Sequence, residues 1–359
     1  MRVAVMGAGA GGAAATVELS LAGHSVALWS RSPRTLEPYQ RAGGVHYRGV
    51  LGDGVLAPGM ITSDAADAIA QADAVVVCLP TFLHRDVGQI LARLPHRVPV
   101  VLNPGHTGGA LEFAQAYHEV AGTMPAVVEF STLTYVARKH QPSEVTVTGR
   151  ANRVRAAALP GGKAALAAAQ VLFSNTEPAA DVLASDLSNV NMVLHPPGAV
   201  LGAAWVEARR GDFTFYVDGM TPGVARVMHD LDLERRAVAR AFGHELPSLI
   251  EEMQAIGTVE KSVTDTSNFA ACIAGGRANK AIKAPDSLEH RYYREDFGFG
   301  LLPFCEFAAI AGVPVPVAQS LLLLESSLTG VDQNATGRTA KRMGIAGYSI
   351  DQLMARVRG

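Results

Sequence analysis

Cysteine is scarce in this chain, and the three that occur, Cys78, Cys272 and Cys305, are far apart in the sequence. Isolated cysteines supply neither a disulfide framework nor a Cys-x-x-Cys metal site, so we expect no metal and a reducing, cytoplasmic location. Net charge is also nearly absent, because 31 Lys and Arg face 33 Asp and Glu. Without a basic excess the chain lacks the phosphate neutralisation that nucleic-acid binding needs, so we expect small-molecule partners and no nucleic acid.

Uninterrupted apolar runs of membrane-spanning length are missing as well. The nearest, residues 301–324, contains Glu306, Gln319 and three prolines, so we interpret it as two buried helices separated by a turn. The apolar N-terminal stretch contains Glu18 and a glycine cluster, which argue against a signal peptide. We therefore expect no membrane partner.

The sequence is instead rich in apolar residues, at 48% of 359 residues, which is enough for a sizeable core and long enough for two domains. From residue 2 to about 130, β-branched runs alternate with amphipathic stretches, which is typical of strands and helices in a parallel sheet. After about residue 181 helical periodicity, caps and proline breaks dominate. We expect an α/β fold: an N-terminal Rossmann-type doubly wound sheet over residues 1–182, followed by a mostly α-helical second domain over residues 183–359.

The expected elements of the first domain can be placed in more detail. Residues 44–58 indicate a small excursion of extra strands, and residues 141–162 indicate two more strands at the sheet edge. The main strands are expected at 3–6, 26–29, 74–79, 98–103 and 127–130, and helices are expected to open at Gly11, Ser32, Ser63, Thr81 and Thr107.

A glycine-rich loop, "VAVMGAGAGGAA", follows the first expected strand and precedes a helix. Gly7, Gly9 and Gly12 stand in G-x-G-x-x-G register: the first allows a tight turn, the second lets backbone approach a pyrophosphate, and the third lets helix pack on strand. The N–H groups around Ala10 and Gly11 would point at the phosphates from the helix N-terminus. The loop predicts a dinucleotide site; a glycine-rich turn without ligand is the alternative.

The end of the second strand decides which dinucleotide is expected. An acid there hydrogen-bonds the ribose 2′-OH of NAD, but this chain has Ser30 and Arg31, with Arg34 one helical turn further on. A hydroxyl and two guanidinium groups suit a 2′-phosphate, so the sequence favours NADP over NAD. The alternative is that both arginines are solvated residues of a surface helix.

Two further stretches fall at strand ends, where open α/β sheets bind ligands. "CLPTFLH" contains Pro80 and "LNPGHTGGALEF" begins next to Asn103, and both residues are expected to shape the walls of the cofactor site. Ordinary turn chemistry explains either stretch equally well.

The helical half carries two polar constellations. In "LSNVNMVLHPPGAV", Asn191 and His195 stand four apart and share a helix face, and Pro196 is expected to end or kink the helix at the histidine. A histidine capping the last carbonyls of a helix is the alternative. In "LEHRYYREDFGFGLLP", Arg291 and Asp296 precede a glycine-rich apolar turn, which suggests a pocket that binds a carboxylate through Arg and orients a base through Asp. A solvated charged loop is the alternative.

These stretches resemble the octopine/nopaline (opine) dehydrogenase family, and particularly its bacterial N-(1-carboxyethyl)-norvaline dehydrogenase type. The matching segments are the glycine loop, "NPGHTGGALEF", "LSNVNMVLHP", "RYYREDFGFGLLP" and "GRTAKRMGIAG", which span nearly the whole chain. The family joins the amine of an amino acid to an α-keto acid and reduces the resulting imine with NAD(P)H. The resemblance implies that His195 is the general acid/base, that Asp296 orients it, and that Asn191 and Arg291 contact substrate. The departure is at Ser30-Arg31, where the norvaline-type relative has an acid.

Other functions stay open from the residues alone. A carbonyl reductase of the ketopantoate or glycerol-3-phosphate dehydrogenase kind has a similar layout and uses a lysine as proton donor, for which Lys261, Lys280 and Lys283 are available. A non-catalytic cofactor-binding protein is the third alternative. The sequence names neither the amino acid nor the keto acid, and it leaves the oligomeric state open, with a homodimer through the helical domain as one arrangement.

Overall fold

The chain folds into two units, each with its own core, in the computed structural model, which describes residues 1–95, 97–276 and 279–359. One unit consists of Met1–Gly105 and Gly109–Ala179, and the other of His106–Gly108 and Ala180–Gly359. The second unit therefore includes three residues that come from within the first half of the chain. The expected limit of the cofactor-binding domain at residue 182 stays a prediction.

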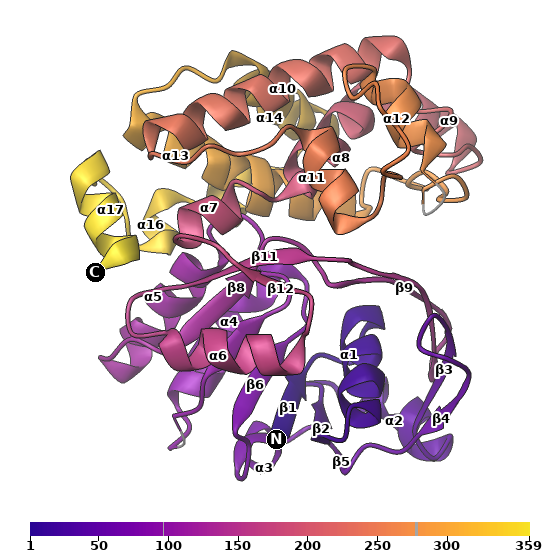
Figure 1. The fold of residues 1–359 in the computed structure, drawn as a ribbon, viewed down its shortest axis with the longest axis vertical. Coiled ribbons are helices and arrows are strands. Elements are labelled where there is room, and N and C mark those ends of the chain that lie inside the picture. Colours follow the sequence, from indigo (N-terminus) through magenta and orange to yellow (C-terminus); the bar gives the residue numbers. More distant parts are fainter. Residues whose placement is uncertain (96, 277–278) are drawn as a thin grey trace. The chain divides into compact units, whose positions relative to one another are not determined.

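A large sheet forms the centre of the first unit (Figure 1). Its strands are β1 (Arg2–Met6), β2 (Ser25–Trp29), β5 (Met60–Thr62), β6 (Ala74–Val77), β7 (Val100–Leu102), β8 (Val127–Phe130), β11 (Val154–Ala158) and β12 (Thr176–Pro178). They lie in the order β12-β11-β8-β7-β6-β1-β2-β5. Six neighbouring strands are mutually parallel, namely β5, β2, β1, β6, β7 and β8, and their order is that of a doubly wound dinucleotide-binding sheet. Strand β11 pairs with β8 in the antiparallel direction. The predicted Rossmann-type fold is confirmed.

A smaller sheet lies beside the first helix. It consists of β3 (Val45–Gly49), β4 (Gly54–Leu56), β9 (Tyr135–Gln141) and β10 (Glu144–Arg150), in the order β4-β3-β10-β9. The expected excursion at residues 44–58 is thus present as β3 and β4. The expectation that both strands of residues 141–162 extend the main sheet is wrong for β10, which pairs with β3 and β9. Alternation along a strand shows that one face is buried but not which neighbour it joins.

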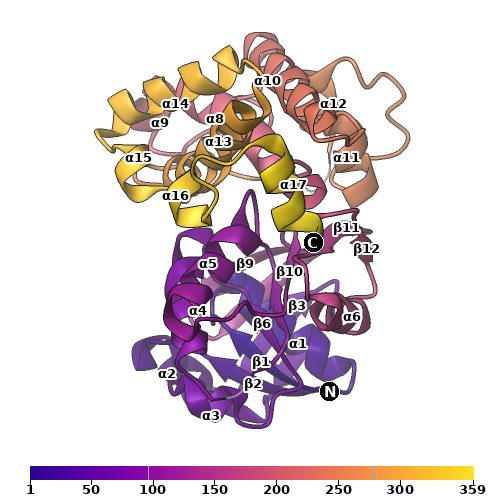
Figure 2. The same ribbon diagram turned by 90° about the vertical axis from the view of Figure 1, so that its left-hand side faces the viewer.

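Helices cover the large sheet on both faces, which explains its nearly continuous runs of buried Val and Ala. Figure 2 shows α4 and α5 side by side along one face and α6 on the other. The helical elements are α1 (Ala10–Leu21), α2 (Pro33–Arg41), α3 (Ala65–Ile69), the 3-10 turn η1 (Thr81–Leu83), α4 (His84–Ala92), α5 (Gly109–Ala121) and α6 (Lys163–Leu172).

The helix expected to open at Gly11 begins one residue earlier, at Ala10, and three other expected helix starts move by one or two residues or change type. Asp64 rather than Ser63 caps α3, because its carboxylate accepts from the backbone N–H groups of Ala66 and Asp67. Thr81 opens a single 3-10 turn ahead of α4. The helix expected from Thr107 begins at Gly109, because Gly108 has a left-handed φ of +74° that a right-handed helix does not contain.

The second unit is helical, and α8 lies at its centre, packed against η2, α10, α11 and α14. Within the described ranges, no helix combines the length and the apolar character needed to cross a membrane. The predicted helix pair in residues 301–324 is confirmed as α13 and α14. The elements are α7 (Val182–Asp186), α8 (Val190–Leu201), α9 (Ala203–Arg209), α10 (Pro222–Ala241), α11 (Leu249–Ile256), α12 (Phe269–Gly275), the π-helix η2 (Tyr292–Leu301), α13 (Leu302–Ala311), α14 (Pro316–Thr329), α15 (Gln333–Thr336), α16 (Ala340–Met343) and α17 (Ile350–Arg358).

Candidate active site

The glycine loop connects β1 to α1 at the carboxyl edge of the large sheet. Gly7 has φ +120°, and a Cβ there would lie 2.5 Å from the carbonyl oxygen of Cys78. A Cβ on Gly12 would lie 1.8 Å from the carbonyl oxygen of Gly7. These two glycines are therefore required by the fold itself, since only glycine fits such close backbone approach.

Gly9 is different, because its backbone is extended and a Cβ built on it meets nothing within 4 Å. It is the N-cap of α1, and no side chain in the described part of the chain caps that first turn. Open space in front of uncapped helical N–H groups fits a pyrophosphate, which would approach the backbone at Gly9 and accept hydrogen bonds from the turn that holds Ala10 and Gly11. The residues present thus fit a nicotinamide dinucleotide.

The carboxyl end of β2 lies next to this loop. The indole Nε1 of Trp29 donates to the carbonyl oxygen of Ser63 at 3.0 Å, which holds the strand end against the segment after β5. Ser30 is half-buried, whereas Arg31 and Arg34 are exposed. Nη1 of Arg31 lies 3.4 Å from Oδ2 of Asp86 on α4. An ion pair this exposed is weak, so Arg31 can exchange Asp86 for a stronger anion.

The other two residues predicted for the cofactor site lie at neighbouring strand ends. Pro80 is exposed in the turn between β6, which ends at Val77, and η1. Asn103 is fully buried after β7, where its Nδ2 donates to Oγ1 of Thr134 at 2.9 Å and its Oδ1 accepts from the backbone N–H of Thr134 at 3.2 Å. The side chain of Asn103 thereby fixes the backbone after β7 against the segment that contains Thr134.

In the second unit, the imidazole of His195 and the carboxylate of Asp296 meet. Nδ1 of His195 lies 2.8 Å from Oδ2 of Asp296, and both residues are buried, with exposed fractions of 4% and 2%. Because a carboxylate only accepts, Nδ1 carries the proton and Nε2 is the acceptor of the neutral ring. The arrangement fixes one tautomer and stabilises the imidazolium form when it arises.

His195 does not end its helix, contrary to the expectation from Pro196. Helix α8 runs on through Pro196 and Pro197 to Leu201, so His195 is an interior residue. Two prolines remove two backbone donors, but the residues around them are buried against η2, α10 and α14. Tertiary packing here outweighs the local preference.

Two tyrosines enclose the imidazole, and no pattern in the sequence singles out the first. The hydroxyl of Tyr216, in the loop after α9, lies 2.7 Å from Nε2 of His195. Tyr292 stacks on the His195 ring, with centroids 3.9 Å apart, and its hydroxyl lies 3.3 Å from that of Tyr216. Since Nε2 is the acceptor of the neutral ring, Tyr216 donates to it, and a short path for a proton leads away from His195.

His106 is a further residue of this site that motif reasoning passed over, although it lies within "NPGHTGGALEF". Its φ of +58° is rare for a residue with a side chain, and it is only 3% exposed. Nδ1 has no hydrogen-bond partner among the described atoms. Burial lowers the pKa of His106, while Glu295 and Asp296 oppose that shift. A strained, buried and unpartnered imidazole near Asp296 is typical of a functional position.

The remaining predicted residues flank this pair. Asn191 is half-buried on the first turn of α8, one turn before His195. Arg291 immediately precedes η2, is exposed, and has its Nε 3.7 Å from Oε2 of Glu295. The expectation of a glycine-rich apolar turn after Asp296 is wrong, because residues 292–301 form a π-helix. π-Helical turns are rare and occur mostly at functional sites, which makes residues 292–301 a candidate part of the active site.

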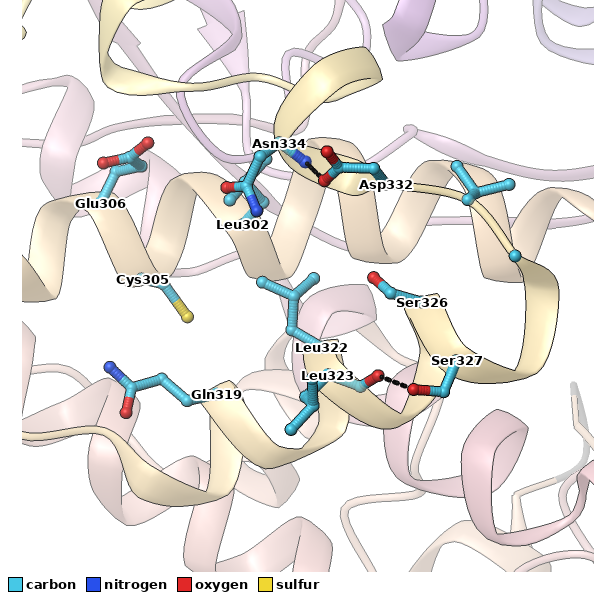
Figure 3. Close-up of a pocket in the computed structure, with 12 residues that line it drawn as sticks. Leu302, Cys305, Glu306, Gln319, Leu322, Leu323, Ser326, Ser327, Asp332 and Asn334 are labelled. Atoms are coloured by element: carbon cyan, nitrogen blue, oxygen red, sulfur yellow. Dashed lines mark hydrogen bonds between the residues drawn. The ribbon is translucent and has the colours of Figure 1, made fainter.

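Other features of the second unit are separate from this pair. A pocket of about 660 Å³ between α13, α14 and α15 is lined by Cys305, Glu306, Leu323 and Asp332 among others (Figure 3). It contains neither His195 nor Asp296. No cluster of metal-ligating side chains occurs among residues 1–95, 97–276 and 279–359.

Comparisons with known proteins divide along the same two halves. Residues 178–329 match the family described as NAD/NADP octopine/nopaline dehydrogenase, alpha-helical domain. Residues 3–161 match the family described as ketopantoate reductase PanE/ApbA. The opine dehydrogenase of Arthrobacter sp. (strain 1C) is 32% identical over 349 residues, which cover 96% of each chain. The octopine dehydrogenase of Mizuhopecten yessoensis is 24% identical over 80% of each chain.

Solved structures show the same fold. An octopine dehydrogenase in complex with NADH and agmatine has a TM-score of 0.78 at 22% identity, covering 99% of this chain and 98% of its own. A yersinopine dehydrogenase with NADP+ bound has a TM-score of 0.75 at 17% identity, covering 100% and 98%. The full-length relative and the helical-domain match together confirm the resemblance that the motifs indicated. The chain belongs to the octopine/nopaline dehydrogenase family and is an oxidoreductase of the opine dehydrogenase type, whose reductive condensation depends on a nicotinamide cofactor.

Proposed function

We propose that this enzyme condenses the amine of an amino acid with an α-keto acid and reduces the imine with NADPH, so that it acts on a CH–NH bond. The observation that carries the proposal is the buried contact between Nδ1 of His195 and Oδ2 of Asp296. The full-length similarity to an opine dehydrogenase supports the reaction class. Octopine dehydrogenase structures with NADH and L-arginine, and with NADH and pyruvate, support these two substrate classes.

The proposed role of His195 follows from the proton balance. An ammonium group must lose one proton before its nitrogen attacks the keto carbon, and the carbinolamine hydroxyl must gain one before it leaves as water. A single imidazole that changes charge near neutrality can do both. Asp296 holds the ring in the required tautomer. When bound, the nicotinamide supplies the hydride that adds to the imine carbon, so that the imine becomes a secondary amine.

Substrate carboxylates are the second requirement, because both partners carry one. Arg291 and Asn191 are proposed to hold them: a guanidinium binds a carboxylate through two parallel hydrogen bonds, and an amide adds a directional donor. The unpartnered Nδ1 of His106 is a further polar group available at the site. Its lowered pKa keeps it neutral at pH 7, so it contributes a hydrogen bond rather than a charge.

NADPH is proposed over NADH on the chemistry at the end of β2. Ser30, Arg31 and Arg34 offer a hydroxyl and two cations where an acid would repel the 2′-phosphate. The exposed Arg31–Asp86 pair leaves the guanidinium free to change partner at little cost.

A grid of amino acids against α-keto acids tests the proposal, with NADPH and NADH consumption followed by absorbance and the secondary amine identified by mass. We expect turnover that requires both substrates. Equal NADPH oxidation with the keto acid alone would favour a ketopantoate-reductase-like carbonyl reductase, in line with the match over residues 3–161. Tight cofactor binding without turnover across the grid would favour a non-catalytic protein.

A further inference from the structure

Lys139, on β9 of the small sheet, reaches the glycine loop. Its Nζ lies 2.7 Å from the hydroxyl oxygen of Tyr39 and 3.4 Å from the carbonyl oxygen of Ala8. The ammonium also lies 4.5 Å from the centre of the Tyr39 ring. Tyr39 is fully buried in α2, and its own hydroxyl donates to the Ala8 carbonyl at 2.9 Å. The cation is therefore anchored to the loop of the dinucleotide site and to the helix that follows β2.

This cation has no counter-ion in the described part of the chain. Its partners are a hydroxyl, a carbonyl and an aromatic ring, and no carboxylate of the described residues lies within 4.0 Å of Nζ. An ammonium has three donors, and two are used here. Lys139 is half-buried, and this burial lowers its pKa. A half-buried, unpaired cation is costly to keep, which makes the position suited to an anion.

We propose that Lys139 binds the 2′-phosphate of NADPH and is a determinant of cofactor specificity. The inference rests on the proposed use of NADPH. The pyrophosphate would be bound by the N-terminus of α1, which begins at Ala10. Lys139 instead contacts Ala8 and α2, the helix that begins after Arg31 and carries Arg34, and so lies on the ribose side of the loop.

Lys139 also differs from the two arginines in its electrostatic surroundings. Arg31 already faces Asp86, and both arginines are exposed and screened by solvent. Lys139 is less hydrated and has no acid among the described residues to release before it binds phosphate. A charge-assisted hydrogen bond in such surroundings contributes more than one on the open surface.

The test compares Lys139→Met with Lys139→Arg and with Lys163→Met, a control that removes the same charge from an exposed position on α6. Dissociation constants for NADPH and NADH are measured by fluorescence titration. Lys139→Met is expected to weaken NADPH about tenfold or more, as loss of one charge-assisted hydrogen bond implies, and to leave NADH unchanged. Lys139→Arg should recover most of the NADPH affinity, and the control should match the wild type.

A measurement on the wild-type protein covers the case in which Lys139→Met does not fold. Reductive methylation of lysines, read by mass spectrometry of peptides, should modify Lys139 more slowly with NADPH than with NADH, while Lys163 reacts equally with both. Equal loss of NADPH and NADH affinity in Lys139→Met, or equal protection by both cofactors, would overturn the inference. If the wild type binds NADPH no more tightly than NADH, the proposed NADPH preference itself fails, which is a distinct result.

Discussion

At the scale of single residues, the chemistry depends on the two nitrogens of His195, each of which has one partner. Changing His195 to Gln removes the titrating group, and changing Asp296 to Asn removes the negative charge and replaces one acceptor oxygen with a donor NH2, so that the tautomer is no longer fixed. Each change is expected to lower kcat/KM by about 10²–10⁴-fold, the usual contribution of general acid–base catalysis. The rate is measured from NADPH oxidation with amino acid and keto acid both present.

The control for this pair is the double variant. Because the two residues act as a unit, His195→Gln with Asp296→Asn should be little worse than His195→Gln alone. NADPH affinity should be unchanged in all three proteins, since the glycine loop belongs to the other unit. Multiplicative losses in the double variant would show that the two side chains work independently.

Tyr216 gives a prediction about the proton path that leads from His195. Its hydroxyl lies 2.7 Å from Nε2 of His195 and donates to the neutral ring. Tyr216→Phe removes that donor and interrupts the path, so kcat/KM should fall by about tenfold, as the loss of one hydrogen bond at the site implies. An unchanged kcat/KM, measured from NADPH oxidation with both substrates present, would mean that Tyr216 takes no part in the proton transfer.

The glycine loop separates glycines needed for folding from one needed for binding. Gly9→Ala adds a methyl group to open space, so the protein should keep its unfolding midpoint and bind NADPH at least about tenfold more weakly, since the methyl group blocks the approach of the pyrophosphate. Gly12→Ala places a Cβ 1.8 Å from a backbone oxygen and should lower the midpoint. Thermal unfolding and a cofactor titration check both. Unchanged affinity in Gly9→Ala would argue against a phosphate at this turn.

At the scale of elements, the close packing of the π-helix η2 can be tested by substituting two of its glycines, Gly298 and Gly300. A Cβ on Gly298 would lie 2.5 Å from Oε1 of Gln333, whereas a Cβ on Gly300 comes no closer than 3.6 Å to Met192. Gly298→Ala should lower the free energy of unfolding by about 1–3 kcal/mol through overpacking. Gly300→Ala should be neutral or stabilising by about 0.5–1 kcal/mol, because alanine loses less backbone entropy. Denaturant unfolding of the two variants measures both, and equal effects would contradict the close packing of η2 against Gln333.

The elements that the sequence predicts well are those with a strong local pattern. The strands and glycine loop of the first unit follow from buried β-branched runs and from glycine spacing, and the α13–α14 pair follows from Pro and Gly breaks. The errors are non-local. Nothing in residues 144–150 shows that β10 pairs with β3, about 100 residues away, and nothing local shows that packing keeps α8 helical through Pro196.

At the scale of the whole molecule, the candidate site was predictable only where a motif carried it. His195 and Asp296 are 101 residues apart and were brought together by a family resemblance, since no physical rule links two such positions in a sequence. Tyr216 lies in none of the matching segments, and His106 lies in one of them without being singled out by its spacing. Their importance arises from a short distance at Tyr216, and at His106 from a rare backbone conformation and an imidazole nitrogen with no partner among the described atoms. These features exist only once the chain is folded.

The pH dependence of stability is also a property of the folded chain, and Glu325 on α14 contributes to it. It is fully buried, and burial raises the pKa of its carboxyl to about 7, although Gln333 and Thr329 oppose the shift with hydrogen bonds. Below about pH 4.5, the ordinary value for Glu, the carboxyl is protonated in both folded and unfolded chains. Between there and about pH 7 only the unfolded chain releases the proton, so this residue makes stability fall as pH rises, by at most about 1.4 kcal/mol per pH unit. Above that range both forms are ionised and the contribution is constant.

Glu325→Gln removes this titration while keeping an amide of the same shape next to Gln333. The free energy of unfolding of wild type and variant is measured by urea denaturation at several pH values from about 5 to about 8, which bracket the raised pKa. The histidines titrate in both proteins, so only the difference between the two reports on Glu325. That difference should shift in favour of the variant as pH rises to about 7 and then level off. Parallel pH curves would mean that the Glu325 carboxyl ionises in the folded protein at its ordinary pKa, and that the hydrogen bonds from Gln333 already stabilise the charged form.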